Sequence, residues 1–193
     1  RGWHPGEAVL RRADLVVINK VDAAPDGVVE ALREDLAGLV PGVPVRLAAS
    51  PVVLDDPDAV RGRRVLVVDD GPTLTHGGMA WGAGYVATRA LADATFVDPR
   101  ASAAPLVRDI FERFPHLGPV LPAFGYGTAQ RAALAATIDG SDAEVVVAGT
   151  PIDFARAVPV RLPVIRARYA HRSADGTDLV DDVRAALGEA ARP

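Results

Sequence analysis

The stretch that decides the fold runs from Val65 to Gly84. It opens with the apolar run Val-Leu-Val-Val at 65–68 and continues as Asp-Asp-Gly-Pro-Thr-Leu-Thr-His-Gly-Gly-Met-Ala-Trp-Gly-Ala-Gly at 69–84. The length and β-branched content of the apolar run are typical of a buried parallel strand, and residues 85–92 have helical character. The glycine-rich stretch is therefore expected at the carboxyl end of a strand, where open α/β sheets bind ligands.

The composition of residues 69–84 favours a binding loop over an ordinary connection, which is the alternative. Its five glycines let the backbone come close to a ligand. Thr73, Thr75 and His76 supply hydroxyl and imidazole groups, and the following helix offers free N–H groups to an anion. Simple strand-to-helix loops are only ~2–6 residues long. We expect no part of this small, polar stretch to belong to the core.

Beyond residue 62, strand-like and helix-like segments alternate, which predicts a three-layer α/β fold with a mainly parallel, doubly wound sheet. Loops after Asp70, Val97, Phe124 and Ala148 are then expected at one edge of that sheet. Residues 54–62 form a polar connector, which predicts two domains at 1–54 and 63–193. The connector's carboxylates (Asp55, Asp56 and Asp58) are interpreted as turn residues, with a metal site as the alternative.

The apolar strand at 15–18 runs directly into Asn19-Lys20-Val21-Asp22, the Asn-Lys-x-Asp pattern by which P-loop GTPases recognise their base. A carboxylate such as Asp22 accepts two hydrogen bonds from guanine, whereas adenine has no donor pair on that edge. Ser50 and Pro51 follow the next strand and are predicted to contact the base through the backbone. The alternative is a solvated strand end. A helix with an apolar stripe at Val29, Leu32, Leu36 and Leu39 is expected between the two strands.

Arg166 and Arg168 are two residues apart in the last predicted strand, at 164–169, so both point to one face of the sheet. Arginine forks suit phosphate and carboxylate oxygens. The competing interpretation, held equally, is an edge strand whose arginines lie in water.

The overall composition is that of an ordinary globular protein. The chain has 193 residues, a formal net charge of −4 and no cysteine, which gives no support for a nucleic-acid partner, a disulfide framework or a thiolate metal site. No apolar run approaches the ~20 residues of a membrane span, and we expect a cytoplasmic protein. Residue 1 is Arg and Met79 is the single methionine, so we expect the chain to be part of a longer protein.

Several strings together resemble the carboxyl-terminal half of the cyclic 2,3-diphosphoglycerate synthetase family and its bacterial relatives described as predicted GTPases. They are Val-Ile-Asn-Lys-Val-Asp at 17–22, Asp-Gly-Pro-Thr-Leu-Thr-His-Gly-Gly-Met at 70–79, Gly-Ala-Gly-Tyr-Val-Ala at 82–87, Val-Asp-Pro-Arg at 97–100, Gly-Pro-Val-Leu-Pro-Ala-Phe-Gly-Tyr-Gly at 118–127 and Gly-Thr-Pro-Ile-Asp at 149–153. The resemblance implies the second half of a P-loop NTPase domain followed by a Rossmann-like part. It also implies an enzyme that uses ATP and Mg²⁺ to close a small phosphorylated acid into a cyclic phosphoanhydride.

In that reaction one substrate phosphate is activated by phosphoryl transfer and then attacked by its neighbour, so catalysis consists of positioning and charge neutralisation. The resemblance places His76 and Arg100 as catalytic cations, with Arg166 and Arg168 beside them. Backbone N–H groups of two glycine turns complete the expected cradle. The substrate-binding set is then Asp70, Gly71, Thr73, Thr75, Gly77, Gly78, Gly125, Tyr126, Gly127, Thr150, Arg166 and Arg168.

Two departures from the family pattern matter. No Gly-x-x-x-x-Gly-Lys-Ser/Thr loop occurs in residues 1–193, so tight triphosphate binding by this chain alone is not expected. Asp22 favours guanine, whereas the family enzyme uses ATP, which leaves ATP or GTP as the nucleotide. The alternatives to an enzyme are a GTP-binding switch or metal-delivery GTPase, and a non-catalytic α/β domain. We also expect a homo-oligomer.

Overall fold

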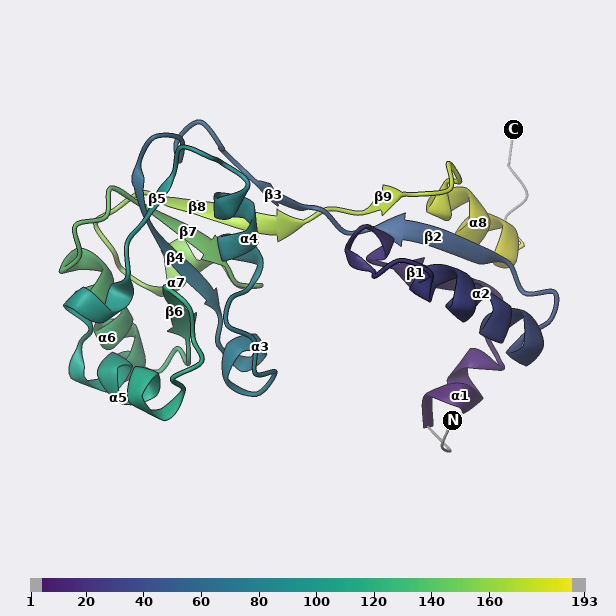
Figure 1. The fold of residues 1–193 in the computed structure, drawn as a ribbon, viewed down its shortest axis with the longest axis horizontal. Coiled ribbons are helices and arrows are strands. Elements are labelled where there is room, and N and C mark those ends of the chain that lie inside the picture. Colours follow the sequence, from purple (N-terminus) through teal and green to yellow (C-terminus); the bar gives the residue numbers. More distant parts are fainter. Residues whose placement is uncertain (1–4, 189–193) are drawn as a thin grey trace. The chain divides into compact units, whose positions relative to one another are not determined.

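The computed structural model describes residues 5–188 (Figure 1). The apolar run at 65–68 lies in strand β4 (Arg64–Asp70), where every residue from Val65 to Asp69 is fully buried. β4 pairs in parallel with β5, β6 and β7. A strand that is buried on both faces is uniformly apolar rather than alternating, which explains the Val-Leu-Val-Val pattern.

Two units make up the chain: unit 1 comprises residues 1–51 and 170–193, and unit 2 comprises residues 52–169. The expected division was 1–54 and 63–193. The structure instead assigns the final segment of the chain to unit 1, and the connector at 54–62 lies within unit 2.

Unit 1 has a three-stranded sheet in the order β1-β2-β9, in which β1 and β2 are parallel and β9 is antiparallel to β2. Its elements are α1 (Pro5–Leu10), β1 (Val16–Asn19), the 3₁₀ helix η1 (Val21–Ala23), α2 (Val28–Leu39), β2 (Val45–Ala49), β9 (Arg172–Ser173) and α8 (Leu179–Ala186). α8 is tied to β2 by a bidentate ion pair between Arg46 and Asp182, with N–O distances of 2.6 Å.

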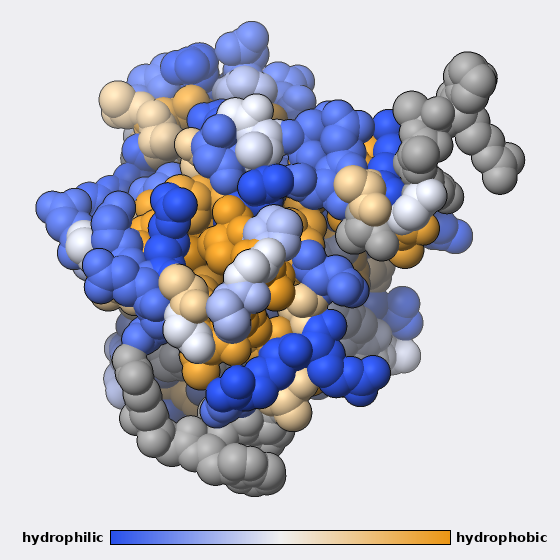
Figure 2. Space-filling view, turned by 90° about the vertical axis from the view of Figure 1, so that its right-hand side faces the viewer, coloured by the Kyte–Doolittle hydropathy of each residue, from blue (hydrophilic) through white to orange (hydrophobic). Residues whose placement is uncertain are grey.

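The core of unit 1 is small. Among the described residues, its hydrophobic cluster has three buried members, Ile18, Leu36 and Val40. Large apolar side chains of the same unit remain exposed, on β1 (Val17), on α2 (Val28 and Leu32), and on α8 and its C-cap (Val180, Val183 and Leu187). Figure 2 shows apolar surface, in orange, open on the face that it turns to the viewer.

Unit 2 contains a six-stranded sheet in the order β3-β8-β7-β4-β5, with β6 also paired to β4. All pairings are parallel except that of β3 with β8. In addition to β4, the elements are β3 (Val52–Leu54), α3 (Gly71–Thr75), α4 (Ala83–Arg89), β5 (Thr95–Phe96), the 3₁₀ helix η2 (Pro99–Ser102), α5 (Pro105–Arg113), β6 (Val120–Ala123), α6 (Thr128–Asp139), β7 (Val145–Gly149), α7 (Phe154–Ala157) and β8 (Val164–Tyr169). The predicted fold class, α/β with a mainly parallel sheet between helices, is confirmed.

The core of unit 2 joins its sheet to its helices. Buried residues of α5 (Val107 and Phe111) and of α6 (Leu134 and Ile138) belong to the same cluster as the apolar residues of β4. α5 and α6 lie side by side (Figure 1). Apolar residues of this kind at helical spacing bury a stripe against the sheet, which stabilises the layered fold.

Several local expectations were wrong. The sequence did not point to a helix near the start of the chain, but α1 begins at Pro5, a residue that is well tolerated in the first helical turn. Within the glycine-rich stretch, residues 71–75 form α3, and Leu74 is fully buried, so the stretch does contribute to the core. The strands β3 and β9 were not predicted. Gly127 is the N-cap of α6. His4 lies outside the described residues.

Candidate functional site

Three polar side chains from three strand ends lie together at the carboxyl edge of the unit 2 sheet. Asp70 ends β4 and caps α3, accepting hydrogen bonds from the Thr73 N–H at 3.2 Å and the Thr73 hydroxyl at 2.8 Å. Tyr126 follows β6, and its side chain is hydrogen-bonded to that of Thr150, which follows β7. Burial raises the pKa of Tyr126, and the negative charge of Asp70 adds to the shift.

Glycine at two positions brings these strand ends close together. A Cβ on Gly71 would overlap the carbonyl of Ala123 at the end of β6, so α3 can begin directly beside that strand only with glycine there. Gly125 leaves room for the side chain of Gln130, whose Oε1 accepts the N–H of Gly127 at 3.0 Å. The turn before α6 is therefore held by α6 itself, and no ligand is needed to form it.

Arg166 lies on the face of the sheet that leads to this edge. In register, Val68 of β4 lies opposite Ala148 of β7, and Ala148 lies opposite Arg166 of β8. Residues that pair across a sheet point to the same face, and Asp70 follows Val68 by two residues on that face. Arg166 Nε is buried and has no hydrogen-bond partner among the residues that the structure describes. A buried donor of this kind favours an acceptor from outside the described chain.

The other predicted cations already have partners. The Arg168 guanidinium is hydrogen-bonded to Asp55 at 2.7 Å. β8 lies between β3 and β7, so the interpretation of an edge strand was wrong. Arg100 donates to the carbonyls of Leu117 at 2.7 Å and Gly118 at 3.1 Å. It also donates to Asp98 and lies 4.3 Å from the Phe111 ring centroid.

His76 ends α3 and is exposed, and its Nδ1 lies 3.0 Å from the Thr75 hydroxyl. The Thr75 hydroxyl also donates to the carbonyl of Gly71. Gly78, in the loop that follows, has a φ of 65°, a conformation that favours glycine. The neighbouring Gly77 has no room for a side chain, because a Cβ there would crowd the Thr73 carbonyl oxygen.

Asp69 organises the far side of this loop, and sequence reasoning missed it. Its carboxylate is fully buried and accepts N–H hydrogen bonds from Gly82 at 2.8 Å, Gly84 at 2.7 Å and Tyr85 at 3.3 Å. Burial raises the pKa of Asp69, although the three hydrogen bonds oppose that shift. A Cβ on Gly149 would overlap both the Asp69 carboxylate and the Gly84 nitrogen. Gly82, Gly84 and Gly149, which are separated in the sequence, were the one sequence signal that could have pointed to Asp69.

The predicted nucleotide residues meet at the carboxyl ends of β1 and β2 in unit 1. The Asn19 side-chain oxygen accepts the Lys20 N–H at 2.8 Å. Lys20 has a φ of 62°, the one positive φ outside glycine in the described part of the chain. Asp22 accepts the Ser50 N–H at 3.1 Å, which joins the two predicted base-contacting segments. The carbonyl of Pro51 accepts the N–H of Ala170 at 2.9 Å.

A metal-binding cluster of three or more histidine or acidic side chains is absent from the described residues. Asp55, in the predicted connector, pairs with Arg168, and Asp56 accepts the N–H of Ala59, as expected of a turn residue. Within residues 5–188, none of the helices has the length and apolar character needed to cross a membrane.

The comparison with protein-family models gave no match. A curated protein from Thermococcus kodakarensis, arginine synthetase ArcE, is 44% identical to this chain over 167 residues. The aligned region covers 86% of this chain but 37% of the length of that relative. The chain is thus similar to somewhat more than a third of a protein named as a synthetase.

Proposed function

We propose that this chain is the carboxyl-terminal part of a nucleotide-dependent synthetase of the cyclic 2,3-diphosphoglycerate synthetase type. In such an enzyme the terminal phosphoryl group of a nucleotide is transferred to an oxygen of a small substrate, and a nucleophile then displaces that oxygen together with its phosphoryl group, which leaves as inorganic phosphate. The observation that carries the proposal is the convergence of Asp70, Tyr126 and Thr150 at one edge of a parallel sheet. The name of the relative supports a synthetase.

The proposal assigns substrate binding to unit 2. Arg166 supplies the cation, because its buried Nε has no partner among the described residues. The hydroxyls of Tyr126 and Thr150 supply donors, and the N–H of Gly78 completes the set, since the Gly77 N–H already donates to the Pro72 carbonyl at 3.2 Å. Arginine suits this task since its fork matches phosphate and carboxylate oxygens. His76 and Arg100 retain their predicted catalytic roles as hypotheses, although the hydrogen bonds of Arg100 equally suit a structural role.

Nucleotide binding is assigned to the Asn19–Asp22 turn and Ser50 in unit 1. The link between Asp22 and Ser50 supports this assignment, because it prearranges two loops that come from different strands. Mg²⁺ is expected to accompany the nucleotide, bound through its phosphates. Whether the base is adenine or guanine is decided by comparing ATP with GTP.

A second candidate reaction is the formation of arginine. The name of the relative favours it, and so does the charge at the unit 2 edge. Among the predicted cations there, Arg166 has a buried Nε without a hydrogen-bond partner in the described part of the chain, and Asp70 contributes a carboxylate on the same face of the sheet. A substrate with several phosphates requires more positive charge than this, whereas an amino acid with a cationic and an anionic end requires one group of each sign.

The test uses the full-length protein that contains this chain. ATP or GTP is supplied with Mg²⁺ and 2,3-diphosphoglycerate, and ³¹P NMR follows the cyclic phosphoanhydride and phosphate. In a parallel reaction, arginine, ADP and phosphate are mixed, and ATP formed by the reverse reaction is detected with luciferase. Product in the first assay supports the phosphorylated acid, and product in the second supports arginine. Absence of nucleotide turnover in both contradicts the synthetase.

A pair of variants tests the site. Arg166→Gln should lower kcat/KM by about 10- to 100-fold, because a hydrogen bond from a charged donor contributes roughly 1.5–3 kcal/mol. Arg168→Gln is the matched control, since it lies on the same strand and face but is paired with Asp55. Equal effects of the two substitutions would contradict the role of Arg166.

A further inference from the structure

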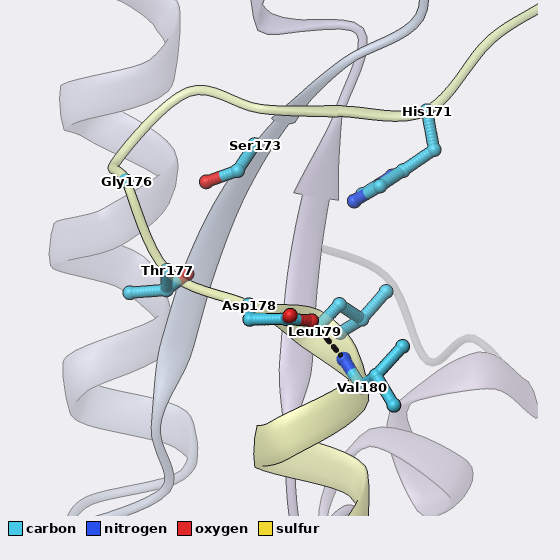
Figure 3. Close-up of a pocket in the computed structure, with 7 residues that line it drawn as sticks. All are labelled: His171, Ser173, Gly176, Thr177, Asp178, Leu179 and Val180. Carbon is cyan, nitrogen blue, oxygen red and sulfur yellow. Dashed lines mark hydrogen bonds between the residues drawn. The ribbon is translucent and has the colours of Figure 1, made fainter.

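A pocket in unit 1 is not used by any residue assigned so far. It has a volume of about 360 Å³ and lies between the segment that enters β9 and the first turn of α8 (Figure 3). His171 stands on one side, with its ring directed across the opening toward Leu179 and Val180. Asp178 is also part of the lining. The volume falls within the ~300–1,000 Å³ range of small-molecule sites.

The pocket adjoins the sheet edge that carries the predicted nucleotide residues. β9 runs antiparallel to β2, with Arg172 opposite Ala49 and Ser173 opposite Ala48. His171 therefore arrives beside Ser50, at the carboxyl end of β2. Ser50 in turn donates its N–H to Asp22. Two segments separated by about 120 residues in the sequence, at Ser50 and at His171, thus meet at one edge of one sheet.

The walls of the pocket are held by the protein's own hydrogen bonds. Asp175 accepts hydrogen bonds from the Leu47 N–H at 2.8 Å and from the hydroxyls of Thr177 at 2.6 Å and Ser173 at 3.1 Å. One oxygen of Asp178 caps α8 by accepting the Val180 N–H at 2.8 Å. The segment at 173–178 is therefore formed in advance, which lowers the entropic cost of binding a ligand.

The chemistry of the lining selects a ligand that is flat on one side and carries hydroxyl groups. The lining contains an imidazole ring, two aliphatic side chains, hydroxyls and a carboxylate, and no lysine or arginine. A phosphate group is disfavoured beside Asp178 without a cation. An aromatic base stacks on a ring such as that of His171, and a carboxylate such as that of Asp178 accepts hydrogen bonds from ribose hydroxyls.

We infer that this pocket holds the nucleoside part of the nucleotide, with His171 stacked on the base and the Asp178 carboxylate accepting a ribose hydroxyl. This inference rests on the proposed function and adds a third wall to the site formed by the Asn19–Asp22 turn and Ser50. In the sequence, His171 follows directly after the last predicted strand, at 164–169. In the structure, the pairing of β9 with β2 places His171 at the carboxyl end of β2, next to the predicted nucleotide residues.

The experiment titrates the full chain with adenosine and with guanosine, and follows the histidine ring signals by NMR. The ring signals of His171 should move upfield with saturation, whereas those of His76 and His116, which lie in unit 2, should stay in place. His171→Ala should weaken nucleoside binding about tenfold or more, since stacking on one base contributes roughly 1–3 kcal/mol. Asp178→Ser keeps a helix-capping hydroxyl, so a folded protein with weaker binding is expected.

The matched control is His76→Ala, which removes the same side chain from unit 2 and should leave the nucleoside affinity unchanged. Unmoved His171 signals, or an unchanged affinity in His171→Ala, would overturn the inference. In the full-length enzyme, His171→Ala should raise the KM for the nucleotide and leave kcat unaltered. If the His171→Ala enzyme turns over with an unaltered KM for the nucleotide, the assignment of the pocket is wrong but the synthetase activity stands. Nucleoside binding at His171 without turnover in any assay supports the pocket and contradicts the synthetase.

Discussion

Replacing Asp69 by alanine should destabilise unit 2 by about 3–5 kcal/mol. The substitution leaves three backbone N–H groups, those of Gly82, Gly84 and Tyr85, without their acceptor. Each buried donor that loses its partner costs roughly 1–3 kcal/mol. The 3.3 Å bond from Tyr85 is the longest of the three and should contribute least. Relief of the buried charge, which raises the pKa of Asp69, offsets part of the loss.

Two measurements check the magnitude. Urea unfolding, followed by far-UV circular dichroism, gives the change in the free energy of unfolding. Amide hydrogen exchange at Gly82 and Gly84 reports the local effect, and both amides should lose protection even where the fold survives. Asp58→Ala is the matched control, because Asp58 is 90% exposed and takes part in a surface ion pair with Arg61. A loss below about 1 kcal/mol, or exchange at Gly84 as slow as in the unaltered protein, would refute the reasoning.

Three further predictions follow from other residues. Gly149→Ala should cost about 1–3 kcal/mol or more, because its Cβ would overlap the Gly84 backbone, whereas Gly38→Ala in α2 meets open space and should be neutral or slightly stabilising in thermal unfolding. Hydrogen bonds from the Thr177 hydroxyl and the Leu47 N–H hold the pKa of Asp175 below its ordinary value of 3.8. Its contribution to stability is therefore present above pH 3.8 and is lost as the pH falls toward the lowered pKa, so Asp175→Asn should lower the urea midpoint of unit 1 at pH 7 and the gap should narrow in acid. Arg100→Ala should lower the thermal midpoint of unit 2, because it removes donors from the Leu117 and Gly118 carbonyls, and a purely catalytic role would leave that midpoint unchanged.

The elements that sequence reasoning predicted well are those with a strong local pattern. The apolar run of β4 and the helix predicted from the stripe of α2 both appear near the expected residues. Local periodicity reports which face of an element is buried, and alternation of strands with helices is enough to predict an α/β class.

The features that were missed depend on contacts between distant residues. β3 and β9 are three and two residues long and exist because they pair with β8 and β2. The return of the final segment to unit 1 depends on Asp175 with Leu47 and Asp182 with Arg46, which are more than 120 residues apart in the sequence. No local pattern carries that information.

The same limit applies to the candidate site. Residues 70, 126 and 150 lie near one another, as expected of loops that follow neighbouring parallel strands, and their role in binding a substrate stays a prediction. Which arginine has a partner was not predictable, since Arg166 and Arg168 have the same spacing and the same face. The difference is that Asp55 pairs with Arg168, and Asp55 comes from a segment that was interpreted as a solvated turn. Similarly, nothing local distinguishes buried Asp69 from Asp70.

The pairing of β3 with β8 has a consequence for how the molecule can be dissected. Val52 and Tyr169, the first and last residues of unit 2, lie opposite each other in register. Just outside them, the Ala170 N–H donates to the Pro51 carbonyl at 2.9 Å. Unit 2 is thus an insertion of 118 residues, counting from 52 to 169 inclusive, between two residues of unit 1 that are hydrogen-bonded to each other. A short turn that joins Pro51 to Ala170 should close unit 1, and the excised unit should be transferable to another hairpin.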